Sequence, residues 1–528
     1  MKRFADLMER LVYTGGRNAK LAILAEYFRT TPDPDRGWAL AALTDGYETR
    51  LLTPAAVRKL AEARTDPVLF GLSYDYVGDL AETTALIWPE AEALPGEAPR
   101  LGEIVDTLAG TSRARAPGHV EGWLDRLDGS GRYALLKLLM GGLRIGVSAR
   151  LAKTALAQYG GKPIAEIEEL WFGLTPPYRD LFAWLDGRAA APQVDTSTLF
   201  RPVMLANPLE DGELDRLAPS DFRAEWKWDG IRVQLAARDG EARLFTRTGD
   251  EIAPAFPDIA DRADFDAVLD GELLVRREGE IRPFNDLQQR LGRKSVTAAM
   301  LRDYPAHLRV YDILFRGDRD LRPDPFEMRR AALEAFVTGL NRDWLDISPL
   351  VPFDDWDALR AIWDGTREAG IEGLMLKRAD APYTAGRPKG PWFKWKRAPL
   401  TADCVLMYAQ RGHGKRSSLY SDFTFGCWRN GPDGAPELVP VGKAYSGYTD
   451  AELKEIDRWI RRNTVEKFGP VRSVTPEIVL EVAFDSVHPS KRHKSGIAMR
   501  FPRIHRLRTD KPAEEADRVE TLAAMIEG

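Results

Sequence analysis

The chain has 528 residues and a mass of 59.1 kDa, which is enough for about two to four domains and excludes a single small module. Its 44% hydrophobic and 29% charged residues are typical of a soluble globular protein and exclude wholesale disorder, collagen-like repeats and coiled-coil fibres. The 75 Lys and Arg residues against 80 Asp and Glu residues give a net charge of -5, so a nucleic-acid partner can be inferred only from local clusters of charge.

The cysteines and the first residues bear on the compartment. Cys404 and Cys427 are the two cysteines, too few for a four-cysteine zinc site or a secreted disulfide scaffold. Asp6 and Glu9 interrupt the apolar stretch that a signal peptide needs, and no uncharged apolar run reaches about 18 residues. We therefore expect a reducing compartment, either the cytoplasm or the nucleoid of a bacterium.

The N-terminal section has the periodicity of helices. Apolar residues recur at spacings of three and four up to about residue 185, as in Leu21, Leu24, Ala25 and Phe28, and strand-like alternation is scarce. The small residues and the proline of 187–195 indicate a linker. This predicts an all-α domain over 1–195.

The middle section consists of short β-rich runs. They begin at 223–228, 231–238 and 242–248, and the Asp239-Gly240 pair between two of these runs is a strong signal for a hairpin. Further strands are expected at 267–269, 273–275, 308–314, 373–377 and 392–396, with helical stretches between them. This order predicts a mixed α/β or α+β domain over 196–398.

The last section, over 399–528, is again rich in strands. The β-type runs are 404–408, 423–425, 438–441 and 478–482, with one helix expected at 450–464. That order fits a small barrel with an inserted helix. The positions near Ala398, Pro399 and Leu400 suit a hinge between two domains.

One short segment of the middle section is the most informative of the chain. EWKWDGIR, from Glu225 to Arg232, places Lys227 at the end of a strand, with Asp229, Gly230 and Arg232 close behind. A lone Lys-x-Asp-Gly-x-Arg pattern occurs by chance in roughly one in a hundred chains of this size. Taken alone, the segment therefore fits a hairpin with exposed charges as well as it fits a functional site. Five further segments follow in order: Phe245-Thr246-Arg247, Asp270-Gly271-Glu272, Tyr311-Asp312-Ile313, Glu372 to Lys377 and Phe393 to Lys396.

Together these segments resemble the covalent nucleotidyltransferases, specifically the ATP-dependent DNA ligases. The Lys227 segment matches motif I, and the later segments match motifs III, IIIa, IV and V in order. Residues 500–511 are similar to motif VI, and 141–147 are similar to a segment of the helical DNA-binding domain of cellular and archaeal ligases. The resemblance implies three domains: a helical DNA-binding domain, an α+β adenylyltransferase (ATP-grasp-like nucleotidyltransferase) domain and a C-terminal β-barrel of the OB-fold type.

The chemistry of a lysine nucleophile constrains its surroundings. The attacking amine must be neutral, yet at an ordinary pKa of about 10.4 only on the order of 0.04% is neutral at pH 7. We expect Arg232, Lys394, Lys396 and a bound divalent ion to oppose the ammonium form and to neutralise a triphosphate. Alternate residues of a strand point to the same face about 6.5 Å apart, so Lys394 and Lys396 can reach one phosphate group. A solvated edge strand guarded by lysines is the alternative, although Phe393 and Trp395 favour a packed strand.

Further roles follow from the resemblance. It implies a ribose contact for Glu272 and stacking on adenine for Tyr311, with a turn-capping acid and a core aromatic as the alternatives. Glu372 opens an apolar strand and suits Mg²⁺, and the expected metal ligands are Glu372 and Glu272. Further expected ATP contacts are Glu225, Arg232 and Arg247, and the motif VI residues expected to act in catalysis are Arg508, Asp510 and Lys511.

A local basic cluster near the C-terminus supports a nucleic-acid partner. Between Phe484 and Lys511 there are eight Lys and Arg residues and two Asp residues, a density typical of phosphate binding. The expected DNA contacts, for some of which a solvated helix face is almost an equal alternative, are Arg144, Arg150, Lys153, Arg247, Lys491, Arg492 and Lys494.

The sequence therefore predicts an ATP-dependent DNA ligase that seals 5′-phosphate/3′-hydroxyl nicks through lysyl-AMP and DNA-adenylate, as a monomer that uses ATP with Mg²⁺ or Mn²⁺, in DNA repair. An RNA ligase or a capping guanylyltransferase would leave the helical front section unexplained. An NAD-dependent ligase would need a four-cysteine zinc module. A non-catalytic nucleic-acid scaffold would have no reason to combine Lys227, Glu372, Lys394 and Lys396.

Overall fold

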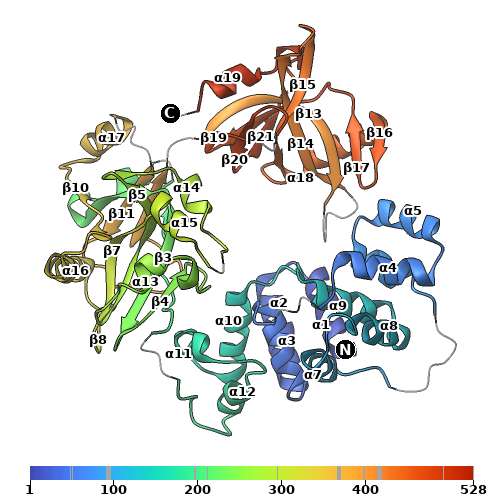
Figure 1. Cartoon of the computed structure of the whole chain (residues 1–528), viewed down its shortest axis with the longest axis horizontal. Coiled ribbons are helices and arrows are strands. Elements are labelled where there is room, and N and C mark those ends of the chain that lie inside the picture. The colour runs from blue at the N-terminus through green and yellow to red at the C-terminus, as the bar shows by residue number, and fades with distance from the viewer. Residues whose placement is uncertain are drawn as a thin grey trace. The chain divides into compact units, whose positions relative to one another are not determined.

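The computed structural model describes residues 1–47, 49, 51–90, 97–194, 198–210, 212–293, 295–365, 370–396, 399–412, 419–490 and 493–526. The chain divides into two compact units, one made of 1–161, 175–190 and 398–528 and the other of 162–174 and 191–397. Figure 1 shows helices in the blue N-terminal part, mixed structure in the green middle part and strands in the orange C-terminal part. Among the described residues, no helix has the length and apolar character of a membrane span.

The N-terminal part is helical, as the sequence predicts. Ser148, Thr53 and three aspartates cap its helices with side-chain oxygens that accept first-turn N–H groups, and Leu21, Leu24 and Phe28 lie in the core. The helices are α1 (Lys2–Tyr13), α2 (Arg17–Thr30), α3 (Asp35–Leu43), α4 (Pro54–Arg64), α5 (Pro67–Val77), α6 (Leu80–Ile87), α7 (Leu101–Ala109), α8 (Ala116–Arg126), α9 (Gly129–Met140), α10 (Ala149–Gly160), α11 (Ile164–Leu170) and α12 (Arg179–Leu185).

The middle part is built on two sheets. The first has the order β1 (Asn207–Pro208), β12 (Trp392–Lys396), β11 (Ile371–Arg378), β2 (Phe222–Trp228) and β10 (Leu350–Val351). The second has the order β4 (Glu241–Thr246), β3 (Ile231–Arg238), β5 (Ala267–Arg277), β7 (Ala306–Arg316) and β8 (Arg319–Asp320), with β6 (Glu280–Ile281) on β5 and β9 (Leu345–Ile347) on β7. Its helices are α13 (Pro257–Ala260), α14 (Phe284–Gln288), α15 (Ala298–Asp303), α16 (Phe326–Leu340) and α17 (Trp356–Gly365).

The turns of this part show which alternatives fail. The Asp239-Gly240 hairpin is confirmed, because β3 pairs with β4 and the two residues have φ angles of 51° and 81°. The alternative of a hairpin at Asp229-Gly230 is wrong, since β2 and β3 belong to different sheets. The strands expected at 267–269 and 273–275 form the single strand β5, so Glu272 is not a turn-capping acid. Gly271 sits within that strand because a Cβ there would lie 2.8 Å from the carbonyl oxygen of Arg309.

The C-terminal part is a β-rich domain with one long helix, as predicted. Its main sheet runs β15 (Pro436–Ala444), β14 (Tyr420–Asn430), β13 (Leu400–Arg411), β17 (Val471–Val474) and β16 (Thr464–Phe468), with β18 (Val479–Phe484) between β13 and β21 (Arg503–Leu507). A hairpin of β19 (Ser486–Pro489) and β20 (Ile497–Arg500) and the helices α18 (Asp450–Arg462) and α19 (Val519–Ala523) complete it. Cys404 and Cys427 are free thiols buried in its core, with their sulfur atoms 3.6 Å apart.

Candidate functional site

Lys227 lies next to last in β2, where the first sheet brings two other charged residues beside it. Strand β11 runs between β2 and β12, and Gly373 faces Lys227 on one side and Lys396 on the other. A Cβ on Gly373 would lie 2.5 Å from the carbonyl oxygen of Trp395, so glycine permits this close pairing. The adjacent Glu372 carboxylate then accepts from both ammonium groups, Lys227 on Oε1 and Lys396 on Oε2 at 3.1 Å.

The environment of Lys227 lowers the pKa of its ammonium group to about 8. Burial is the largest cause, and the cations Lys396 and Lys394 act in the same direction, whereas Glu272 and Asp229 oppose them. At a pKa of about 8, roughly one lysine in ten is neutral at pH 7. The structure thus supplies a larger fraction of neutral amine than an exposed lysine has.

The Asp229-Gly230 turn carries the chain from the first sheet to the second and passes close to β5. A Cβ on Gly230 would lie 2.5 Å from the carbonyl oxygen of Leu273 and 2.8 Å from Cγ of Glu272, so only glycine fits this approach. Burial raises the pKa of Glu272 to about 7, against the opposing effect of Lys227 and Arg232. Glu272 therefore lies in the middle of β5, close enough to Lys227 for their charges to interact.

The guanidinium group of Arg232 is paired with the buried carboxylate of Asp270. Its Nε and Nη2 donate to Asp270 at 3.0 and 2.6 Å, and its Nη1 donates to the Met204 carbonyl at 2.8 Å. The Tyr383 hydroxyl also donates to Asp270, at 2.6 Å. The predicted effect of Arg232 on Lys227 remains a prediction, because the cations that lower the pKa of Lys227 here are Lys396 and Lys394.

Glu225, two residues before Lys227, anchors a buried charged and aromatic cluster. Its carboxylate accepts from Lys377 at 2.6 Å and from Arg330 at 3.0 Å. The Lys377 ammonium group lies 4.5 Å from the ring centroid of Tyr311 and 4.7 Å from that of Trp392. The half-buried Tyr311 is therefore fixed against this cluster. Arg330 was missed from the sequence because it lies on α16, far from the motifs.

Strand β12 presents its two lysines as the sequence predicts. Phe393 is buried and Trp395 packs against the same apolar cluster, and β12 lies between β1 and β11, so the alternative of a solvated edge strand is wrong. Burial and the cations Arg387, Lys396 and Arg247 lower the pKa of Lys394. Arg247, exposed in the turn after β4, therefore belongs to the same positive region. Arg387 is a further member that the sequence did not single out.

The carboxylates of this site fit a hard divalent ion only together with a substrate. Among the described residues there is no group of three or more His, Cys, Asp or Glu side chains arranged to hold a metal. Mg²⁺ takes one or two carboxylates and keeps waters and substrate phosphates as its other ligands. Glu372, with Glu272 nearby, supplies that number, so these residues fit Mg²⁺ bound with a nucleotide.

The motif VI residues lie in the turn after β21 of the C-terminal part. Arg508 donates to Asp510 at 2.9 and 2.8 Å, and it holds the pKa of that carboxyl at about 2. Lys511 donates to Asp403 at 2.8 Å. In the same part Lys494 pairs with Glu437, whereas the predicted DNA contacts Lys491 and Arg492 lie outside the described residues.

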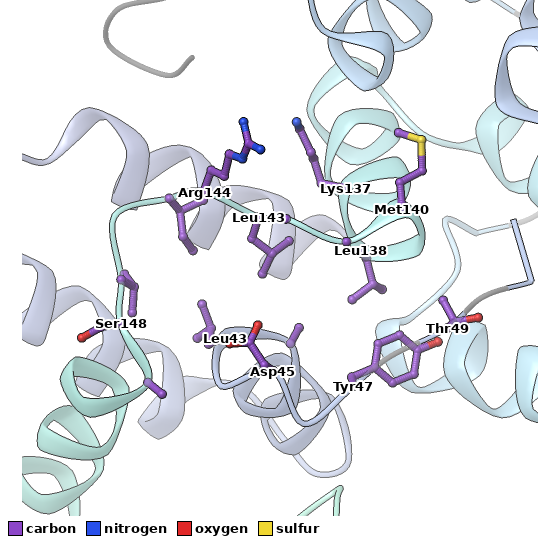
Figure 2. Close-up of a pocket in the computed structure, with 16 residues that line it drawn as sticks. Leu43, Asp45, Tyr47, Thr49, Lys137, Leu138, Met140, Leu143, Arg144 and Ser148 are labelled. Carbon is purple, nitrogen blue, oxygen red and sulfur yellow. The ribbon is translucent and has the colours of Figure 1, made fainter. Parts of the chain in front are cut away.

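The helical part has a pocket of 640 Å³ that is lined by residues of 42–47, by Thr49 and by residues of 137–149. Figure 2 shows that the side chains of Lys137 and Arg144, which line this pocket, are directed away from Leu43. Arg144 has a φ of 48°, and the loop that carries it is fixed by the buried Lys20, whose ammonium group donates to the carbonyls of Ile145 and Gly146 at 2.9 Å each. Sequence reasoning missed Lys20, because nothing local distinguishes it from a surface lysine.

A second pocket, of 590 Å³, is lined by part of the same loop. Arg17, Lys20, Ser148, Arg150 and Thr154 are among the residues that line it. Ser148 caps α10, and Arg150 follows in the first turn. Lys153 is half-buried one turn further along. The predicted DNA contacts Arg144, Arg150 and Lys153 are thus brought onto one loop and the start of one helix.

Comparison with known proteins gives consistent findings. The middle part matches the family model "ATP dependent DNA ligase domain" over residues 203–396, and the C-terminal part matches "ATP dependent DNA ligase C terminal region" over 416–511. A "Probable DNA ligase" of Koribacter versatilis is 30% identical over 98% of this chain and 95% of that protein. "DNA ligase 1" of Korarchaeum cryptofilum is 30% identical over 100% of this chain and 98% of that protein. The solved structure "Pmar-Lig_PreS3" supports the fold, with a TM-score of 0.60 at 17% identity over 96% of this chain and 99% of that one.

Proposed function

Because this chain belongs to the ATP-dependent DNA ligase family, we propose that it joins 5′-phosphate and 3′-hydroxyl ends at nicks in duplex DNA, with Lys227 as the nucleophile. The observation that carries the proposal is Lys227 itself. Its pKa of about 8 is low for a lysine, and its ammonium group shares the Glu372 carboxylate with Lys396. A lysine poised in this way is the requirement of covalent nucleotidyl transfer.

The first step transfers AMP to the protein. The Lys227 ammonium group first loses a proton to solvent, and its Nζ attacks the α-phosphorus of ATP. The nitrogen loses a second proton as the phosphoramidate bond forms, and pyrophosphate leaves as the bond between the α-phosphorus and the bridging oxygen breaks. Lys394 and Lys396, on one face of β12, neutralise the phosphate oxygens. Mg²⁺, when bound by Glu372 and Glu272, supplies further neutralisation of the phosphates.

The next two steps join the DNA. A 5′-phosphate oxygen of the nick attacks the lysyl-AMP phosphorus, the P–N bond breaks, and the Lys227 nitrogen takes up a proton from solvent and leaves as the free amine. This step forms a DNA-adenylate. The 3′-hydroxyl oxygen then attacks the 5′-phosphate, and AMP leaves as the phosphodiester bond forms. Lys227 is not needed as a free nucleophile in this last step.

The nucleotide is proposed to lie against β2, β5 and β7. Glu272, whose pKa of about 7 leaves it able to donate or accept a hydrogen bond at neutral pH, contacts the ribose. Tyr311 stacks on adenine, and Glu225 and Arg232 contact the nucleotide from the buried side. Arg508, Asp510 and Lys511 act on the pyrophosphate end of ATP during the first step.

DNA is proposed to bind mainly through its phosphates. The protein contacts are Arg144, Arg150 and Lys153 on the helical domain (1–195), Arg247 on the adenylyltransferase domain (196–398), and Lys491, Arg492 and Lys494 on the OB-fold domain (399–528). Such binding is independent of sequence and dependent on salt. A monomer working in DNA repair, and also where replication and recombination leave nicks in the bacterial cytoplasm, is the proposed setting.

A labelling experiment tests this proposal against its rivals. Incubation of the protein with α-labelled ATP and Mg²⁺, followed by a denaturing gel, should give a covalent AMP band that is lost on addition of pyrophosphate. A GMP band from labelled GTP would support a capping enzyme, and no band with either nucleotide would favour a nucleic-acid scaffold. Sealing is also assayed on a nicked RNA duplex in parallel with the nicked DNA duplex, and a preference for the RNA nick would support an RNA ligase.

A further inference from the structure

Asp403, a residue of β13 outside the recognised motifs, binds two cations of motif VI, Arg508 and Lys511. Nη1 of Arg508 donates to its two carboxylate oxygens at 3.1 and 2.9 Å, and Nζ of Lys511 donates to Oδ2 at 2.8 Å. The Asp403 side chain is 11% exposed, so these contacts are largely shielded from water. One carboxylate therefore holds a guanidinium group and an ammonium group side by side.

Asp403 is itself held rigidly. It pairs with Glu481 of β18 in the sheet register. Its backbone N–H donates to the Asp517 carboxylate at 2.8 Å, and its carbonyl accepts from the Asp517 N–H at 2.8 Å. The backbone of Asp403 is therefore bonded to β18 on one side and to Asp517 on the other, which fixes the position of its side chain.

Arg508 and Lys511, by contrast, lie beyond the last strand. Strand β21 ends at Leu507, and the residues that follow form a turn. The backbone N–H of Arg508 donates to the carbonyl of Val479 at 2.9 Å. The side chains of Arg508 and Lys511 are held by their contacts with Asp403. The hydrogen bond from Lys511 to Asp403 raises the pKa of Lys511, which keeps its charge at all physiological pH values.

We propose that Asp403 is a positioning residue for the adenylylation step, because it presets Arg508 and Lys511 as a pair that receives the pyrophosphate end of ATP. This inference rests on the proposed function of motif VI in that step. Lys511 has three N–H donors, and the contact with Asp403 occupies one, so the others stay available for phosphate oxygens. Groups held in place before the substrate arrives need no reorganisation in the transition state.

The test compares two steps of the reaction in the full-length protein. Asp403→Ala and Asp403→Asn are assayed for lysyl-AMP formation in a single turnover with saturating ATP and Mg²⁺, and for sealing of a nick that already carries the 5′-adenylate. We expect Asp403→Ala to slow lysyl-AMP formation by between about tenfold and a hundredfold, the range for misplaced groups. Asp403→Asn, which keeps an acceptor oxygen, should lose less, and the sealing of the adenylylated nick should stay within about twofold of the wild-type rate.

A matched control separates positioning from stability. Asp457 is also a buried carboxylate of this domain and accepts from Arg461 at 2.7 Å and from the Tyr420 N–H at 2.9 Å, but it does not belong to the motif VI cluster. Asp457→Asn should affect the two steps equally, in line with its effect on the melting temperature. The same equal effect for Asp403→Ala would overturn the inference, because it would show a structural role.

Non-additivity is the second readout. Asp403→Ala combined with Arg508→Ala and Lys511→Ala should be little slower in lysyl-AMP formation than Arg508→Ala with Lys511→Ala, since Asp403 acts through the two groups it holds. Fully multiplied effects would contradict the inference. Absence of lysyl-AMP in the wild-type protein would instead overturn the proposed function, so the two failures are distinguishable.

Discussion

The pH dependence of lysyl-AMP formation is the most quantitative consequence of the site. The ordinary pKa of a lysine is 10.5, and that of Lys227 is about 8, a difference that corresponds to about 3 kcal/mol against the ammonium form. The neutral fraction at a pKa of about 8 is roughly 9% at pH 7, 50% at pH 8 and 91% at pH 9. The rate should therefore rise about fivefold from pH 7 to pH 8 and level off above pH 9.

The assay is a single turnover with saturating ATP and Mg²⁺, quenched in acid-free denaturant and resolved on a gel. The direction follows from the chemistry: the reactive form is the deprotonated amine, so the rate falls as the pH falls through the pKa of Lys227. Sealing of a nick that already carries 5′-AMP serves as the control, because it does not use this amine. A rate that is flat between pH 7 and pH 9, or that still rises steeply above pH 10, would refute the assignment of the shifted pKa to the nucleophile.

Three further changes separate metal, DNA and scaffold roles. Glu372→Gln removes the carboxylate between two lysines, so adenylylation should fall and need several-fold more Mg²⁺; an unchanged metal titration would assign Glu372 to structure. A chain that begins near Lys162 keeps the 162–174 segment of the middle unit and should still form lysyl-AMP. Its sealing activity should drop about a thousandfold at about 150 mM salt if three phosphate contacts of about 1.4 kcal/mol each are lost. Normal sealing at this salt concentration would disprove the DNA-binding role of the helical part. Lys20→Met frees the loop of Arg144 and should weaken nick binding about tenfold without slowing adenylylation, as measured by titration with labelled nicked duplex; slower adenylylation would argue against a role limited to DNA.

The elements of this fold were predictable wherever local chemistry decides them. The span 392–396 was predicted to the residue, because Phe393 and Trp395 alternate with two lysines. The Asp239-Gly240 hairpin was also predictable from local chemistry, since Asp-Gly readily adopts the positive φ angles of its turn. In the helical part, the apolar spacing of Leu21, Leu24 and Phe28 predicted helix, and these residues lie buried in α2.

Tertiary pairing decided what the sequence did not show. Asp229-Gly230 has the composition of a hairpin turn, but packing of Gly230 on β5 directs the chain into a second sheet. Asp270-Gly271 has the same composition and lies inside a strand, because Gly271 faces the backbone of β7. The partners of the recognised residues were likewise invisible: Asp403 lies about a hundred residues from Lys511, and Lys20 lies well over a hundred residues from the loop it binds.

The central claim is that Lys227 becomes covalently bound to AMP, and one measurement tests it most directly. Wild-type protein and Lys227→Ala are incubated with α-labelled ATP and Mg²⁺, and the labelled peptide of the wild-type protein is mapped by mass spectrometry. The account predicts one labelled peptide carrying AMP on Lys227, no label on Lys227→Ala, and partial sealing of a pre-adenylylated nick by that variant. Normal labelling of Lys227→Ala, or AMP on another residue of the wild-type protein, would contradict it.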